Sequence, residues 1–250
     1  MTSQPVPRGN VRPRAIGHPS EAGGSDRPPE RSFDQATFYQ MVESMCLAIN
    51  EAADYLSALD QAIGDGDHGS NMRRGFSAVH RNIGDISTME FSEACSLIGS
   101  TLLMNVGGAS GPLYGSLFMA FGNASARFTA TPDPARPFPM RPFPGTTGAI
   151  AIMMRSGVEA VMARGRSDIG AKTMLDVLVP LMLALESDTL HSLENICLLV
   201  NTAADDTRNI VATKGRAAYL GVRSLGHIDP GAASAAIIVT AICQTFMEKT

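Results

Sequence analysis

Apolar residues recur at spacings of three and four along most of the chain, the pattern of a helix with one buried face. This spacing predicts helices over 38–59, 72–83, 91–102, 111–127, 147–164, 172–186, 190–211 and 232–248. Pro180 should kink the sixth of these or mark its second half. Strand-like alternation is scarce, so we expect an all-α bundle or barrel of eight helices with antiparallel neighbours.

Two segments lack this apolar periodicity. Residues 1–32 are rich in Pro, Gly, Ser and Arg and nearly devoid of apolar residues, so we expect a disordered N-terminal extension before a folded domain at 33–250. Residues 131–145 contain six prolines, which exclude a helix and indicate an extended surface connection.

Composition excludes several classes of function. Hydrophobic residues make up 44% of the chain, charged residues 18%, and the net charge is −4. Nucleic-acid binding is not expected, because no basic run exceeds Arg73-Arg74. No stretch approaches the roughly 20 apolar residues of a membrane span, and the N-terminus lacks a secretory signal. The four cysteines fall in helical patterns without metal-ligand spacing, as expected of a reduced, cytoplasmic protein.

The first candidate site is the glycine-rich turn after the first helix. Asp60, Asp65 and Asp67 lie within eight residues, and such a cluster of carboxylates repels itself unless a cation binds among them. The ligands are oxygens, which favours a hard cation. The spacing does not fit a calcium EF-hand, so Mg²⁺ is the better interpretation. The alternative is a solvated acidic turn in which Asp67 or Ser70 caps the next helix.

Two further turns carry glycines and polar residues. In the segment 105–114, Gly107, Gly108, Ala109 and Ser110 precede a helix whose first turn suits Pro112. Exposed amides at such a helix start form an anion site, although a tight turn between helices is an equally simple interpretation. It is not a Walker A loop, because no lysine follows the last glycine.

The segment 212–232 combines cations with an Asp-Pro-Gly turn before an apolar helix. Arg216 offers a planar fork to a phosphate. Asp229, Pro230 and Gly231 either border a ligand or simply cap the helix, with Asp229 as N-cap and Pro230 as its first residue.

Taken together, these motifs resemble the L subunit of dihydroxyacetone kinase, whose fold also forms the C-terminal nucleotide domain of single-chain dihydroxyacetone kinases. The resemblance covers about residues 34–248. The segments that carry it are Asp60 with Gly64–Asn71, Gly107–Tyr114, Lys172–Asp176, Thr213–Gly221 and Gly226–Ala232.

The resemblance implies an eight-helix up-and-down antiparallel barrel with the nucleotide, ADP or ATP, at one end. Asp60, Asp65 and Asp67 would hold two Mg²⁺ ions. The phosphate and ribose region would be lined by His68, Gly69, Ser70, Asn71, Gly108, Ala109 and Ser110. Gly165 and Met174 would border the adenine, and Arg216 with Asp229, Pro230 and Gly231 would complete the pocket. Arg216 or Lys214 would absorb charge that develops during phosphoryl transfer.

Two departures from the family stand out. Ala171 replaces the acidic residue of the usual Gly-Asp-Lys-Thr-Met, which should loosen the loop beside the base, and the segment 131–145 is longer than the usual connection.

The resemblance also implies partners. In this family the ketose binds covalently to a histidine of a separate K subunit or domain, so catalysis needs that partner. The phosphoryl donor is either exchangeable ATP or a bound ADP that a phosphotransferase-system phosphocarrier rephosphorylates. The ketose is dihydroxyacetone or a close relative, and a homodimer is expected. The alternative function is a nucleotide-binding regulatory module without catalysis of its own.

Overall fold

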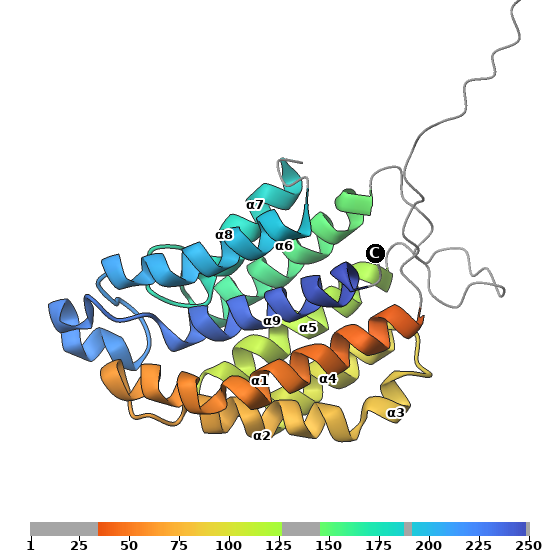
Figure 1. The fold of residues 1–250 in the computed structure, drawn as a ribbon, viewed down its shortest axis with the longest axis horizontal. Helices are drawn as coiled ribbons and strands as arrows, with labels where there is room; N and C mark the ends of the chain where they lie inside the picture. The colour runs from red at the N-terminus through yellow and green to blue at the C-terminus, as the bar shows by residue number, and fades with distance from the viewer. Residues whose placement is uncertain (1–34, 127–145, 188–191, 249–250) are drawn as a thin grey trace, which may run out of the picture. The chain divides into compact units, whose positions relative to one another are not determined.

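The structure, a computed structural model, describes residues 35–126, 146–187 and 192–248 (Figure 1). The long helices in these ranges are α1 (Gln35–Ile63), α2 (His68–Arg81), α4 (Phe91–Asn105), α5 (Ser110–Ala126), α6 (Thr146–Gly165), α7 (Leu175–Glu186), α8 (Leu193–Asp206) and α9 (Pro230–Met247). A one-turn helix, α3 (Ile83–Ile86), and two 3₁₀ segments, η1 (Thr207–Asn209) and η2 (Arg216–Ser224), complete the described part. The predicted all-α class is confirmed.

Neighbouring helices in the chain are also neighbours in space. Contacts run in order through α1, α2, α4, α5, α6, α7, α8 and α9, and α9 packs in turn against α1. Short turns join α1 to α2 and α4 to α5, so these neighbours are antiparallel. This order of contacts is the one that an up-and-down arrangement requires.

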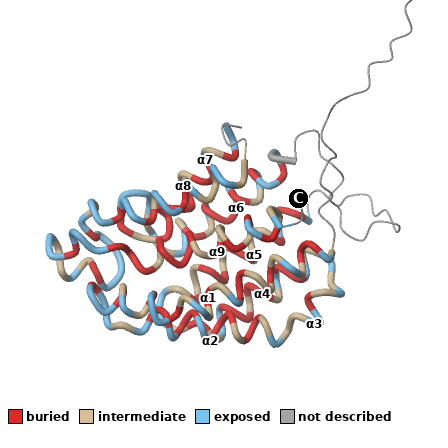
Figure 2. The backbone as a smooth tube through the Cα atoms, viewed as in Figure 1, coloured by how far each residue is buried: buried red, intermediate tan, exposed pale blue. Residues whose placement is uncertain are grey.

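The core lies between the helices and explains their apolar periodicity (Figure 2). Phe76, Ile98 and Leu102 are fully buried, as is Tyr114, whose ring meets Phe76 edge-on with centroids 6.3 Å apart. Close packing of this kind fixes each helix in rotation about its axis. The polar ends of α1, α2, α5 and α9 are therefore held in fixed positions relative to one another.

Because the helices alternate in direction, every second connection falls at the same end. The connections 64–67, 106–109, 166–174 and 207–229 gather at one end, toward the left in Figure 1. The predicted extension 1–32 and the Pro-rich segment 131–145 lie outside the described residues.

Two predicted helices differ from the structure in three details. α7 begins at Leu175 rather than at 172, because Lys172 has a positive φ of 62°. α8 ends at Asp206 and the chain continues as a 3₁₀ turn, instead of remaining helical to 211. Pro180 does not divide α7, which runs through it and loses only the bond that a backbone N–H would make to Asp176.

The expectation that no segment approaches the apolar length of a membrane span needs correction. Helix α9 is long and apolar enough by length and composition, with 18 residues. Its small residues, among them Ala232, Ala235 and Ala236, are buried against neighbouring helices, and it packs on α1 and α8. The apolar composition of α9 is therefore explained by its place in the helical core.

Candidate functional site

All four connections at one end of the helices contribute to a single cavity of about 170 Å³. Its walls come from segments more than 160 positions apart in the sequence. The lining residues are Asp60, Ile63, Asp65, Asp67, His68, Asn71, Gly107, Gly108, Ala109, Ser110, Leu113, Tyr114, Lys172, Thr173, Met174, Lys214, Gly215, Arg216, Ala217, Asp229, Pro230 and Gly231.

One wall of the cavity is acidic. Carboxylate oxygens of Asp60, Asp65 and Asp67 lie within 4.8 Å of one another. Asp60 is buried in the last turn of α1 and accepts a hydrogen bond from the His68 backbone N–H at 3.1 Å. Gly66, with a φ of +78°, lets the chain reverse between the two helices.

The Asp67 carboxylate is not occupied by helix capping, whereas Asp60 accepts from the first amide of α2. Asp67 stands at the N-cap position of α2, but its φ and ψ are helical and its side chain makes no capping bond. Ser70 donates to the backbone carbonyl of Asp67 instead, so the simple capping interpretation fails. Asp65 pairs with the Arg216 guanidinium at 2.9 Å. Three converging carboxylates with oxygen ligands only therefore fit a hard cation such as Mg²⁺.

Another wall is formed by the start of α5. Gly108 has a φ of +64°, which turns the chain so that Ser110 opens the helix. Helix N-termini present unpaired amides and a partial positive charge. This wall is therefore suited to an anion, and it lines the same cavity as the carboxylates.

His68 sits between the two walls. Its Nδ1 lies 3.2 Å from the Ser110 hydroxyl and its Nε2 lies 3.1 Å from the Ser234 hydroxyl. Burial lowers the pKa of the ring, and the nearby carboxylates of Asp60 and Asp67 oppose this only in part.

The third wall is the start of α9. As predicted, Asp229 is the N-cap, accepting from the Ala232 N–H at 2.7 Å, and Pro230 is the first helical residue. Burial raises the pKa of Asp229 to about 7. Capping and lining the cavity are thus functions of the same residue, so the two interpretations of this turn do not exclude each other.

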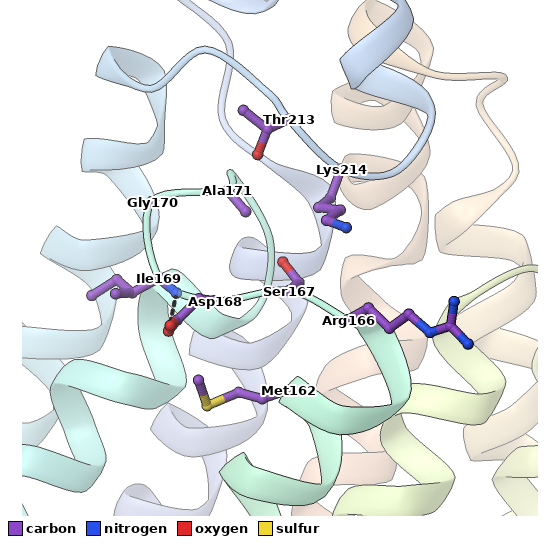
Figure 3. A pocket seen from close by; sticks show the side chains of 9 residues that line it. All are labelled: Met162, Arg166, Ser167, Asp168, Ile169, Gly170, Ala171, Thr213 and Lys214. Carbon is purple, nitrogen blue, oxygen red and sulfur yellow. Dashed lines mark hydrogen bonds between the residues drawn. The ribbon is translucent and has the colours of Figure 1, made fainter.

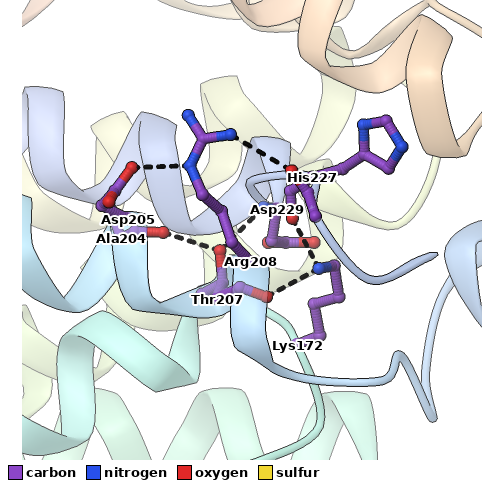
Figure 4. Close-up of polar contacts among 8 residues, drawn as sticks. Lys172, Ala204, Asp205, Thr207, Arg208, His227 and Asp229 are labelled. Carbon is purple, nitrogen blue, oxygen red and sulfur yellow. Dashed lines mark hydrogen bonds and ion pairs between the residues drawn. The ribbon is translucent and has the colours of Figure 1, made fainter. Parts of the chain in front are cut away.

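A buried lysine holds the connections together (Figure 4). Lys172 is 1% exposed, and its ammonium donates to the carbonyls of Thr207 at 2.6 Å, His227 at 2.6 Å and Ile210 at 3.2 Å. Burial lowers its pKa, and the negative charge of Asp229 opposes this. One side chain from the connection 166–174 therefore satisfies three carbonyls of the connection 207–229.

Replacing Lys172 by Met is expected to destabilise the protein by about 3 kcal/mol or more, because three inward-facing carbonyls lose their donor. Urea unfolding at neutral pH measures this. Lys214→Met is the matched control: Lys214 is exposed, so its loss should change stability by about 0.5 kcal/mol at most. Equal effects of the two replacements would contradict a structural role for Lys172.

A second, larger cavity of about 420 Å³ lies beside the loop 166–171 (Figure 3). It shares Lys214 with the first cavity and is otherwise lined by Met162, the loop and Thr213. Arg166 and Lys172, at the two ends of this loop, both have positive φ, which fixes its course.

Ala171 lies inside this loop and replaces the acidic residue expected there. Its side chain is buried, and its carbonyl accepts from the Thr213 N–H at 3.2 Å. The carboxylate of Asp176 accepts from the N–H groups of Gly170 and Thr173, at 2.6 and 2.7 Å. The loop is thus held through Asp176 in the presence of Ala171.

The structure brings most of the predicted site residues to the main cavity, with three exceptions. Gly69 packs against α1, where an added Cβ would come within 1.8 Å of the Ala53 carbonyl. Ser70 is exposed and turned toward Asp67. Gly165 lies behind Leu113, which lines the cavity in its place.

The family model of the DAK2 domain matches residues 62–244. This chain belongs to the DAK2 domain family. The matched region contains all four connections that build the main cavity.

Relatives of this DAK2 chain match over most of its length. It is 39% identical over 197 residues to the ADP-binding subunit DhaL of PEP-dependent dihydroxyacetone kinase 1 of Listeria innocua, covering 79% of this chain and 89% of that subunit. It is also 39% identical over 189 residues to the ADP-binding subunit DhaL of the PEP-dependent dihydroxyacetone kinase of Escherichia coli, covering 73% and 83%.

A solved structure supports the fold. The dihydroxyacetone kinase of C. freundii superposes with a TM-score of 0.64 at 23% identity, covering 94% of this chain but 39% of that one. The DAK2 chain therefore corresponds to part of that longer kinase.

Proposed function

We propose that this chain is the nucleotide-binding L subunit of a small-ketose kinase and binds ADP or ATP with Mg²⁺. The observation that carries this proposal is the convergence of Asp60, Asp65 and Asp67 within 4.8 Å, in the cavity that the start of α5 also lines. A carboxylate cluster facing helix N-termini suits a metal-bridged polyphosphate. The names of the Listeria and E. coli subunits, which bind ADP, agree with it.

The remaining walls suit the rest of a nucleotide. The phosphates would lie between the carboxylates and Ala109–Ser110, beside His68. The base would lie toward Met174 and Leu113, near the loop 166–171. Asp229, Pro230 and Gly231 would border the nucleotide from α9.

We propose that Arg216 stabilises charge that develops during transfer. Its guanidinium reaches Asp65 from η2 and is largely exposed at the cavity rim. Mg²⁺ held by the three carboxylates would neutralise phosphate oxygens and align the transferred group. A cation on Asp65 would weaken the pull of that carboxylate on Arg216, which would then be available to a phosphate oxygen.

The ketose is proposed to come from a separate K subunit. The histidine that lines the main cavity, His68, has a serine hydroxyl on each ring nitrogen, so it is poorly placed to hold a sugar covalently. The relatives named above are themselves subunits. Dihydroxyacetone or a close relative is the proposed acceptor, and a homodimer stays a prediction.

Of the two donor schemes we favour bound ADP that a phosphocarrier rephosphorylates, since the two subunits named above belong to PEP-dependent kinases. Rapid desalting of the purified protein followed by nucleotide analysis tests this. Retained ADP, and ketose phosphorylation with a K subunit and a phosphocarrier but not with free ATP, are expected. An empty protein that turns over ATP with its K subunit would support the other donor.

The same reconstituted system separates a kinase from a regulatory module. Asp65→Asn should abolish ketose phosphorylation while the protein stays folded. If the wild-type protein binds Mg²⁺ and ADP but no K subunit supports phosphorylation, the kinase assignment fails and the regulatory module is favoured.

A further inference from the structure

A buried network of side chains lies beneath the His68 ring. The Ser234 hydroxyl on α9 lies 3.1 Å from His68 Nε2, 2.8 Å from the Tyr114 hydroxyl and 3.0 Å from the Gly231 carbonyl. Ser234 is 0% exposed and Tyr114 is 1% exposed. Since Ser234 belongs to the interior of an alanine-rich helix, its sequence context gives no reason to single it out.

The number of protons in this network determines their positions. The Gly231 carbonyl can only accept, and each of the two hydroxyls has one proton. The two hydroxyl protons satisfy the two shortest contacts if Tyr114 donates to Ser234 and Ser234 donates to the Gly231 carbonyl. The longer contact from Tyr114 to the Gly231 carbonyl, at 3.5 Å, then needs no proton. Because the Ser234 proton is already used, the contact between Ser234 and Nε2 requires a proton on that ring nitrogen.

From this geometry we infer that Ser234 is a positioning residue, which holds the His68 ring with its proton on Nε2. Tyr114 and the Gly231 carbonyl orient the Ser234 hydroxyl. Nδ1 then accepts the proton of the Ser110 hydroxyl, so His68 and Ser110 line the cavity as one oriented pair. The start of α2 is thereby tied to α5 and α9 at the point where the proposed phosphates lie.

The effect on nucleotide binding rests on the proposed function, whereas the position of the ring proton does not. Nitrogen NMR of ¹⁵N-histidine-labelled, nucleotide-free protein at pH 8 reports the proton directly, with His68→Gln assigning the signal. We expect the Nε2–H form in the wild-type protein and in Tyr114→Phe, because Ser234 keeps its carbonyl acceptor there. Ser234→Ala should instead populate the Nδ1–H form.

Ser125→Ala is the matched control. Ser125 is also buried and donates to the carbonyl three residues earlier, Gly122, at 2.8 Å, but at the other end of α5. Ser125→Ala should lower the free energy of unfolding about as much as Ser234→Ala does, but it should not change the His68 signal. The comparison therefore separates a positioning role of Ser234 from a purely structural one. An Nδ1–H form in the wild-type protein, or an unchanged ring signal in Ser234→Ala, would overturn the inference.

Calorimetric titration with ADP and Mg²⁺ tests the functional consequence. Ser234→Ala should bind about 10-fold more weakly than Ser125→Ala, because the His68–Ser110 pair loses its orientation. Equal affinities of the two variants would contradict a role in nucleotide binding. If the wild-type protein binds no ADP at all, the proposed function fails while the NMR result still decides the ring proton.

Discussion

Asp67→Asn should weaken Mg²⁺-dependent ADP binding by at least about 100-fold, or roughly 2.7 kcal/mol. Asn keeps the size of the side chain and one oxygen, but it removes the charge that holds the cation. The Asp67 carboxylate makes no capping bond, so no structural contact of that kind is lost. Titration calorimetry in the presence of Mg²⁺ measures the effect.

Asp54→Asn provides the control for this replacement. Asp54 lies on α1 outside the cavity, with a 91% exposed side chain that pairs with Arg73. Its replacement should leave ADP affinity within about twofold. In EDTA, Asp67→Asn should be at least as stable as the wild-type protein, because one of three mutually repelling charges is gone. Wild-type affinity in Asp67→Asn would exclude this residue from the metal site.

Asp229→Asn should stabilise the nucleotide-free protein at alkaline pH. Burial raises the pKa of Asp229 from 3.8 to about 7, so the folded protein retains a proton there that the unfolded chain has released. The contribution of Asp229 to the free energy of unfolding therefore falls as the pH rises from about 4 to 7, and it falls no further above about pH 7. Asn is neutral throughout and still caps α9. The difference should grow from near zero at pH 4 to at most about 4 kcal/mol at pH 8.

Urea unfolding in EDTA at several pH values measures how the difference in stability between Asp229→Asn and the wild-type protein changes with pH. The attraction between Lys172 and the Asp229 charge is already part of this raised pKa, because it opposes the effect of burial. Asp205→Asn, at an exposed carboxylate on α8 that pairs with Arg208, is the control and should change stability by about 1 kcal/mol at most. A constant difference between wild type and Asp229→Asn across pH 4–8 would contradict the raised pKa.

The sequence predicted the helices and the composition of the site, because both depend on local patterns. Apolar spacing located α1 and α4 well, and the glycine-rich turn after α1 indicated the cluster of Asp60, Asp65 and Asp67. The Asp-Pro-Gly signal for the start of α9 was also local, and it held.

Contacts between distant segments could not be predicted in this way. Lys172 reads as an ordinary charged residue, but its three acceptors lie 35 to 55 positions away, so its burial depends on how the connections meet. Ser234 meets His68 across 166 positions. Whether Asp67 caps α2 depended on its backbone angles, which the residue type alone left open.

The most direct test of a metal-bound nucleotide between the carboxylates and the start of α5 is ADP titration of the stripped wild-type protein with Mg²⁺ and with EDTA. We predict a Kd of about 10 μM or below with Mg²⁺, and binding at least about 100-fold weaker in EDTA. Equal affinity under both conditions, or no binding in either, would contradict it.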